Sequence, residues 1–235
     1  MLAARMGDLK VKDLAEINKA IQAGAITDAS WANHSDGASQ GALAVVAFDK
    51  AILDGERAAC SLVWWKSSKL KRKVGSTLAA EAQALLKGLG ELMWAKAIQA
   101  EMLDPHFSLA GFRDSVQAQA DIVLQKSNTD EVLKESLSEV DAKSLYDNLM
   151  KAGAQAQDKF TALDVTIARE KIDGLGVQLR WVEHQSMPVD SLTKLGANRD
   201  TLVQLIESGT FRLEAEEDLM KDRLYRRQTG TVKPR

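Results

Sequence analysis

Three short apolar stretches separated by turn patterns, followed by one long amphipathic segment, constrain the fold of this chain most strongly. The stretches are residues 25–31, 41–48 and 59–65, and turn-forming residues lie between them at 33–38 and at 54–55. Gly, Asn and Asp favour tight turns at such positions. Because short connections join antiparallel neighbours, the first quarter of the chain predicts a three-stranded meander.

After residue 75 the pattern alternates between helical and strand-like segments. Residues 76–102 carry apolar side chains at helical spacing, and Ser76 or Thr77 can cap the helix. Further helices are predicted at 142–151, at 160–172 and at 201–206, and Leu163, Ile167 and Ile172 are the expected core positions of the second of these. Pro188 suits the first turn of a closing helix that carries Asp190. Strands are predicted within 133–140 and at 177–182. The order predicts an α/β fold: a mixed five-stranded sheet of three antiparallel strands and then alternating strands and helices, with helices on its faces.

The segment boundaries predict one domain with appendages. We expect a connecting helix within residues 1–23, because apolar residues recur at helical spacing up to Gly24. Residues 24–196 form the α/β domain, and a polar stretch at about 103–130 is an insertion into it. Residues 197–235 are expected to form a short helix and a charged tail that contributes little to the core.

Composition points to an intracellular globular protein. Apolar residues make up 45% of the 235 residues, charged residues 27%, and the formal net charge is −2. The protein is therefore not a polycation, so nucleic acid would need a local basic surface. Cys60 is the one cysteine, which excludes an intrachain disulfide. We expect a cytoplasmic or nuclear location without membrane association, since no apolar run reaches spanning length.

Four acids lie in or beside apolar segments at predicted strand ends and helix starts. They are Asp28, Glu81, Asp141 and Asp190. Glu81 stands three residues after Leu78 and four before Leu85, so we expect it on the buried side of its helix. An ionised carboxylate in apolar surroundings is costly unless a positive group compensates it. Magnesium prefers oxygen ligands, and a pair of such ions can promote phosphodiester hydrolysis. The four acids therefore predict a shared metal site.

Each acid taken singly also has an ordinary explanation. Glu81 near a helix start is favoured by the helix dipole, and Asp141 and Asp190 can act as N-caps. Asp28 can form a turn with Ser30 next to it. Sequence alone leaves these alternatives open.

A run of cations precedes the predicted long helix. Five positive charges fall within residues 66–73, with no acid among them. Such a segment can follow a phosphate backbone by charge alone, although a solvated loop is the ordinary explanation. Trp64, Trp65 and Trp181 lie on predicted strands, where core packing or a helix contact is expected. One of the adjacent pair Trp64 and Trp65 must face away from the core, where its ring can pack against sugars or bases. The candidate nucleic-acid-binding residues are Lys66, Lys69, Lys71, Arg72 and Lys73.

An ordered set of motifs spans roughly residues 20–196. They are residues 27–32 (TDASWA), 63–68 (VWWKSS), 76–85 (STLAAEAQAL), 140–146 (VDAKSLY), 163–170 (LDVTIARE) and 179–194 (LRWVEHQSMPVDSLTK). Together they resemble the ribonuclease H domain of copia-type LTR retrotransposon polyproteins. The motifs occur in the order found in that family, which makes the set more specific than any single motif.

The resemblance implies an RNase H-like fold and hydrolysis of the RNA strand of RNA–DNA hybrids. It also implies work beside the reverse transcriptase portion of a polyprotein. The four acids match the acids of the family, which hold two Mg²⁺ ions, with Mn²⁺ as a substitute. Asp28 would bridge both ions, Glu81 and Asp141 would hold the ion nearer the leaving group, and Asp190 the ion that activates water.

His184 lies six residues before Asp190, in a predicted loop. The resemblance implies that a histidine here helps the product to leave, and an imidazole can also shuttle a proton near neutral pH. A solvent-exposed loop histidine without a role is the alternative.

Two other functions remain open at this stage. The chain can be a non-catalytic or domesticated retroelement remnant that folds and binds nucleic acid or a partner. It can also be another RNase H-like nuclease, such as an integrase or resolvase, although a helix glutamate directly after the third strand argues against the integrase arrangement.

Overall fold

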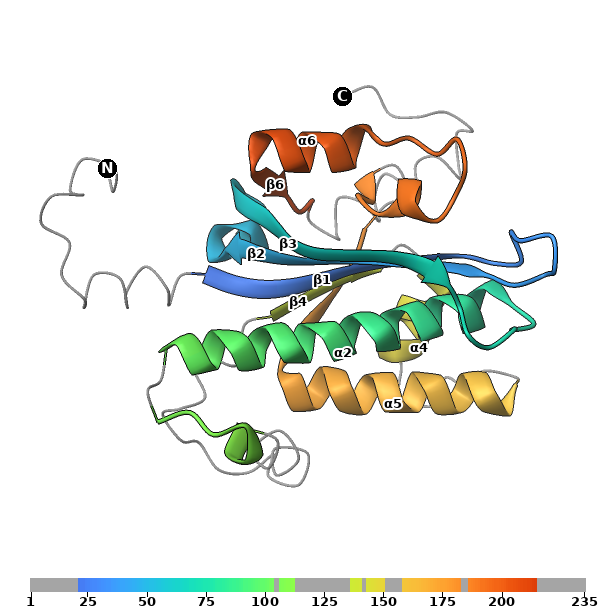
Figure 1. Cartoon of the computed structure of the whole chain (residues 1–235), viewed down its shortest axis with the longest axis horizontal. Helices are drawn as coiled ribbons and strands as arrows, with labels where there is room; N and C mark the ends of the chain where they lie inside the picture. Colours follow the sequence, from blue (N-terminus) through green and yellow to red (C-terminus); the bar gives the residue numbers. More distant parts are fainter. Residues whose placement is uncertain are drawn as a thin grey trace, which may run out of the picture.

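The computed structural model describes residues 21–103, 106–112, 136–140, 143–150, 158–182 and 186–214. A six-stranded sheet with the order β5-β4-β1-β2-β3-β6 runs through its centre (Figure 1). Its strands are β1 (Ile21–Ser30), β2 (Gln40–Asp49), β3 (Arg57–Lys69), β4 (Ser136–Val140), β5 (Val177–Trp181) and β6 (Thr210–Arg212).

The directions of the strands confirm the mixed sheet expected from the sequence. β1, β2 and β3 form an antiparallel meander, whereas β4 pairs in parallel with β1 and with β5. β6, which the sequence analysis did not predict, adds an antiparallel sixth strand beside the start of β3.

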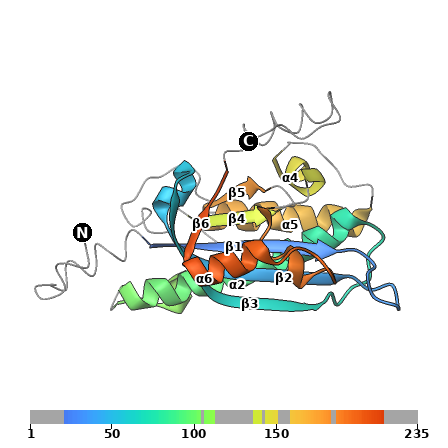
Figure 2. The same cartoon turned by 90° about the horizontal axis from the view of Figure 1, so that it is seen from above.

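Helices cover both faces of the sheet. The lower face in Figure 1 carries α2 (Thr77–Leu103), α4 (Lys143–Met150) and α5 (Lys159–Leu175). The other face carries α6 (Asp200–Ser208), which lies over the β2–β3 side (Figure 2), and the short 3-10 turn η5 (Asp190–Leu192). A second 3-10 turn, η2 (Lys50–Asp54), connects β2 to β3.

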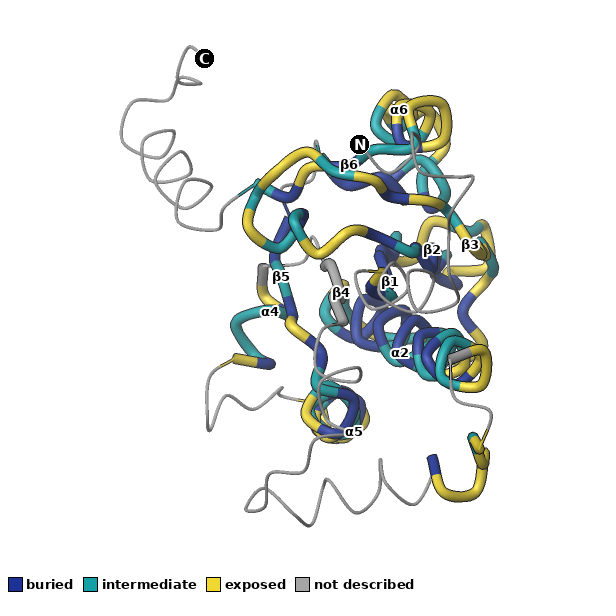
Figure 3. Tube along the Cα trace, turned by 90° about the vertical axis from the view of Figure 1, so that its left-hand side faces the viewer, coloured by how far each residue is buried: buried dark blue, intermediate teal, exposed yellow. Residues whose placement is uncertain are grey.

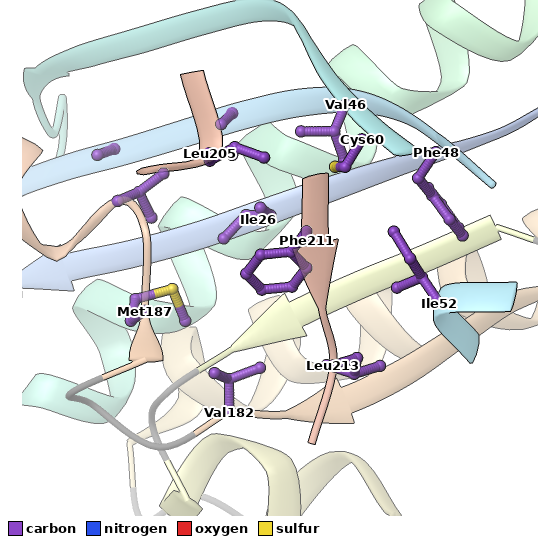
Figure 4. Close-up of a cluster of buried hydrophobic side chains, with 13 residues drawn as sticks. Ile26, Val46, Phe48, Ile52, Cys60, Val182, Met187, Leu205, Phe211 and Leu213 are labelled. Atoms are coloured by element: carbon purple, nitrogen blue, oxygen red, sulfur yellow. The ribbon is translucent and has the colours of Figure 1, made fainter. Parts of the chain in front are cut away.

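The two larger hydrophobic clusters of the described residues fill the space between the sheet and these layers. Figure 3 marks the buried positions along the chain in dark blue. Ala25 of β1 packs with Leu85 and Leu89 of α2 in the cluster under α2, α4 and α5. Ile26 belongs to the opposite cluster, with Met187, Leu205 and Phe211 (Figure 4). Because side chains alternate along a strand, Asp28 faces the same side as Ile26, which is the side of η5.

The long helix begins and packs as the sequence predicts. The Ser76 hydroxyl accepts a hydrogen bond from the Ala79 backbone N–H at 3.2 Å, which identifies Ser76 as the cap. Farther along α2, a Cβ at Gly88 would lie 2.3 Å from the Thr27 Cγ2. Gly88 therefore lets α2 approach β1 closely, one residue before Asp28.

Lys96 ties α2 to the end of α5. Its ammonium donates a hydrogen bond to the Leu175 carbonyl at 2.7 Å, where the helix leaves carbonyls without intrahelical donors. Burial lowers the pKa of Lys96 to about 8. The other end of α5 is capped by Asp158, whose carboxylate accepts from the N–H groups of Phe160 and Thr161.

Several local predictions were wrong. Residues 21–23 open β1, paired with β2, instead of ending a helix, and the rest of the expected N-terminal helix lies outside the described residues. The segment that carries Asp190 is the short η5 rather than a full closing helix. Leu163 was expected in the core but is 55% exposed, because α5 turns Val165 and Ala168 to the sheet instead.

The aromatic side chains also divide differently from the prediction. Trp181 is buried as expected, whereas Trp64 and Trp65 are 51% and 55% exposed. Both lie on the part of β3 beyond its pairing with β6, where adjacent residues point to opposite faces.

The described part of the expected C-terminal appendage packs on the sheet. Leu205, Phe211 and Leu213 belong to the same buried cluster as Ile26. Most of the predicted insertion and the tail after residue 214 lie outside the described residues. None of the helices that the structure describes is long and apolar enough to cross a membrane.

We predict that Gly88→Ala lowers the free energy of unfolding by about 1–3 kcal/mol, because the new methyl group collides with Thr27 across the helix–sheet interface. Chemical denaturation measures this change. Gly90→Ala is the matched control, because a Cβ there meets nothing within 4 Å. That variant is expected to gain about 0.5–1 kcal/mol from reduced backbone freedom. Equal effects of the two variants would contradict the close approach of α2.

Candidate metal and nucleic-acid site

Asp28 lies near the carboxyl end of β1 and is completely buried. It pairs with Ala42 of β2, so it is part of the sheet and not of a turn. Its Oδ2 accepts a hydrogen bond from the hydroxyl of Thr193, which follows η5 and is itself buried. The strand and this hydroxyl fix the direction of the carboxylate.

Lys194 places its ammonium between two buried carboxylates. Its Nζ forms an ion pair with Asp190 Oδ1, one helical turn earlier, and lies 4.0 Å from Asp28 Oδ2. The Lys194 side chain is 35% exposed, whereas those of Asp28 and Asp190 are 0% and 6% exposed. Two acids 162 positions apart in the sequence therefore share one cation.

Polar side chains from β3 and from the loop after β1 hold the turn that carries these groups. The Asn33 side-chain amide donates to the Thr193 carbonyl at 2.8 Å, and the Ser67 hydroxyl donates to the Leu192 carbonyl at 2.5 Å. Gln40 donates to Ser67 and contacts the His34 ring at 2.9 Å. Asn33 is thus a support for the turn that carries Asp190.

Glu81 is buried on α2, as its helical position predicted. It lies one turn before Leu85, which packs with Leu145 of α4 and Ala25 of β1. α2 covers the face of the sheet opposite η5, so Glu81 and Asp28 belong to different faces of the sheet.

The end of β4 lies beside the candidate site. Its last residue, Val140, pairs with Thr27, which comes one residue before Asp28.

The structure brings together two of the predicted ligands but not a larger group. Among the residues that it describes, no three His, Cys, Asp or Glu side chains are arranged to hold a metal ion. Oδ1 of Asp28 and Oε2 of Glu81 are buried and accept no hydrogen bond from the described part of the chain, although both residues have other interactions. Asp141 and His184 lie outside the described residues.

The ordinary explanations for the three described acids do not account for their positions. No side-chain capping bond is formed at the start of η5, where Asp190 pairs with Lys194 instead. Glu81 is the fifth residue of α2 and is buried, which differs from a solvated acid in the first turn. Asp28 lies within a ten-residue strand.

The predicted basic run is divided between β3 and the turn before α2. Lys69 pairs with Asp36, and Lys73 donates to the Asp36 carbonyl. The Lys69 hydrogen bond, with the Ala38 N–H, lowers the pKa of Asp36 to about 2. Arg72 pairs with Asp164 of α5 and lies 5.6 Å from the centre of the Phe160 ring. Three of the five cations therefore interact with the protein's own groups.

Lys66 and Lys71 are exposed and lie near Lys87 of α2. Burial, and then the positive charges of Lys66 and Lys71, lower the pKa of Lys87. The Lys87 ammonium donates to the Ser68 hydroxyl at 2.7 Å, which places it on the α2 side of β3. We call Lys66, Lys71 and Lys87 the basic surface.

Three residues of this region were not among the predicted site residues: Thr193, Lys194 and Lys87. Thr193 and Lys194 stand three and four positions after Asp190, the spacing of neighbours on one helical turn, and this signal was available in the sequence. Lys87 gave no such signal, because only the packing of α2 beside β3 brings it to Lys66.

No family model matches the chain, and no curated protein matches it. Solved structures that are similar at low identity include the following two. RNase H1 from the halophilic archaeon Halobacterium salinarum NRC-1 is 14% identical, and the match covers 78% of this chain and 98% of that one with a TM-score of 0.41. The N-terminal RNase H domain of Rv2228c from Mycobacterium tuberculosis, solved as a fusion with maltose-binding protein, is 11% identical. That match covers 80% and 98%, with a TM-score of 0.42.

We predict that Thr193→Val lowers the free energy of unfolding by about 1–3 kcal/mol, because it removes a hydrogen-bond donor from a buried carboxylate while keeping the volume. Thr193→Ser keeps the hydroxyl and is expected to lose less than about 1 kcal/mol. Urea denaturation of both variants measures the difference. If the serine variant is as unstable as the valine variant, the hydroxyl does not stabilise Asp28.

Proposed function

We propose that this chain is a metal-dependent endoribonuclease that cleaves the RNA strand of RNA–DNA hybrids, and that it works within a retrotransposon polyprotein beside a reverse transcriptase. The observation that carries the proposal is the pair Asp28 and Asp190, two buried carboxylates that share a cation at the end of the central strand. The ordered motifs of the copia-type family supply the substrate class and the polyprotein context.

The two carboxylates fit a divalent metal ion. Their oxygens are the hard donors that magnesium prefers, and Lys194 shows that the space beside them accepts a positive charge. Asp28 and Asp190 would hold the ion, with Glu81 and Asp141 as candidates for the two-ion arrangement that the resemblance implies. When bound, such an ion supplies an acidified water and neutralises charge on the phosphate.

The chain's own groups orient these ligands. The Thr193 hydroxyl donates a hydrogen bond to Oδ2 of Asp28. The side chains of Asn33 and Ser67 donate hydrogen bonds to the backbone carbonyls of Thr193 and Leu192. Fixed ligands need no rearrangement when substrate arrives, which is the usual requirement for catalysis by positioned charges.

The basic surface lies across β3 from the turn that carries Asp190. Ser67, whose hydroxyl contacts the Leu192 carbonyl, is the residue after Lys66, and adjacent residues of a strand point to opposite faces. A phosphate backbone lying along Lys66, Lys71 and Lys87 would therefore run on the α2 face of β3. Lys66 and Lys87 lie on the α2 side of β3, as does the exposed Trp64, whose ring can pack against sugars or bases.

A second function, hybrid binding without catalysis, is favoured by one observation. The described residues contain no group of three metal-ligating side chains, so they do not by themselves make a two-ion centre. In this alternative the domain uses the basic surface to bind nucleic acid. Hybrid binding in calcium, compared with turnover in magnesium, separates the two functions.

We predict that the purified protein cleaves the RNA strand of a labelled hybrid in Mg²⁺ or Mn²⁺ and that EDTA stops the reaction. Asp28→Asn should lower the rate by at least about a hundredfold, because a ligand charge is lost. Gel analysis of a hybrid labelled on the RNA strand measures the rate. Asp173→Asn, an exposed acid of α5, is the control and should cleave like the wild type. An intact hybrid in both metals would contradict the enzymatic proposal.

The basic surface gives a prediction about binding. Lys66→Ala combined with Lys71→Ala should weaken hybrid binding and lower the slope of log affinity against log salt by about 2, one for each lost phosphate contact. Fluorescence anisotropy in calcium at several salt concentrations measures both quantities. Lys159→Ala at the exposed start of α5 controls for the loss of a surface lysine. An unchanged slope in the double variant would exclude these two lysines from the interface.

A further inference from the structure

We propose that Lys194 is an internal counter-ion, which holds the Asp28–Asp190 pair in the metal-free protein and is displaced when a divalent ion binds there. This inference rests on the proposed metal-dependent function. Lys194 would then help to set the affinity of the site for the divalent ion.

The geometry places the ammonium among the atoms that a metal would use. Nζ of Lys194 pairs with Oδ1 of Asp190 and lies 4.0 Å from Oδ2 of Asp28. Thr193, the preceding residue, donates to that same Oδ2. One cation thus pairs with Asp190 and lies within ion-pair distance of Asp28, in the space beside both carboxylates.

Burial favours a cation at this position. The side chains of Asp28 and Asp190 are 0% and 6% exposed, and two ionised acids near each other repel strongly where water is excluded. Without a metal, both acids stay ionised only if a group of the protein balances their charge, since protonation of one acid is the alternative. Lys194 follows Asp190 by one turn, so it supplies that charge from the same short segment.

The partial exposure of Lys194 makes displacement possible. At 35% exposure, its side chain borders solvent, while the carboxylates do not. A lysine has four rotatable bonds and a strongly hydrated head, so the ammonium can move outward without disturbing the fold. A divalent ion and an ammonium cannot occupy the same oxygens, because their charges repel each other. Metal affinity therefore includes the cost of releasing Lys194.

Isothermal titration calorimetry with Mg²⁺ and Mn²⁺ on the whole chain, without nucleic acid, tests this proposal. Lys194→Met should bind the metal roughly tenfold more tightly than the wild type, because the competing charge is gone. Its metal-free Tm should be lower than that of the wild type, and saturating metal should raise its Tm by a larger interval. Lys194→Arg, which keeps the charge, should bind the metal like the wild type, and Lys159→Met controls for the loss of a lysine elsewhere.

The outcomes separate this inference from the proposed function. Metal binding by the wild type with unchanged or weaker affinity in Lys194→Met would overturn the counter-ion role and leave the nuclease proposal standing. No metal binding by the wild type or any variant would overturn both. If Lys194→Met does not fold, NMR of the wild type labelled at the lysine ε-carbon replaces it, with Lys194→Arg for assignment. A Lys194 resonance that does not shift on metal addition would then overturn the proposal.

Discussion

Two neighbouring carboxylates inside a protein need their charge compensated, either by a cation or by protonation of one of them, and here Lys194 is the cation. In this chain that constraint joins the central strand to the C-terminal part of the domain, because Asp28 comes from β1 and Asp190 and Lys194 from the turn at η5. The desolvation cost of the two buried acids is offset by Lys194 only while the two segments stay together. The position of η5 against the sheet is therefore coupled to the charge balance of the candidate site.

The rest of the fold supports this contact from both sides. On one face, α2 approaches β1 closely at Gly88, which fixes the strand just before Asp28. On the other face, Asn33 and Ser67 hold the backbone of the η5 turn, and Leu205 and Phe211 complete the cluster that contains Ile26. The site is thus assembled from segments that lie far apart in the sequence and pack on the same buried cluster, the one that contains Ile26. A substitution in that cluster is therefore expected to change the positions of the two carboxylates.

Much of the fold was predictable, because local patterns encode it. Alternating and helical spacings predicted the meander, the long helix and the strand that became β5, and these predictions are confirmed. The failures have physical causes. β6 has only three residues, and its strand state depends on pairing with β3. Residues 21–23 fit a helical pattern locally, but pairing with β2 extends β1 through them. Leu163 was misplaced because burial of Val165 and Ala168 sets the rotation of α5.

The amino-acid sequence by itself determined the element order, the acids in apolar segments and the segments of the chain that carry charge. It did not determine which groups meet. That Lys194 lies between Asp28 and Asp190, that Lys87 joins Lys66, and that Arg72 pairs with Asp164 on α5 follow only from the packed structure. The physical reason is that charge interactions act through space over a few ångströms, whereas sequence patterns record only neighbours along the chain or within one helical turn.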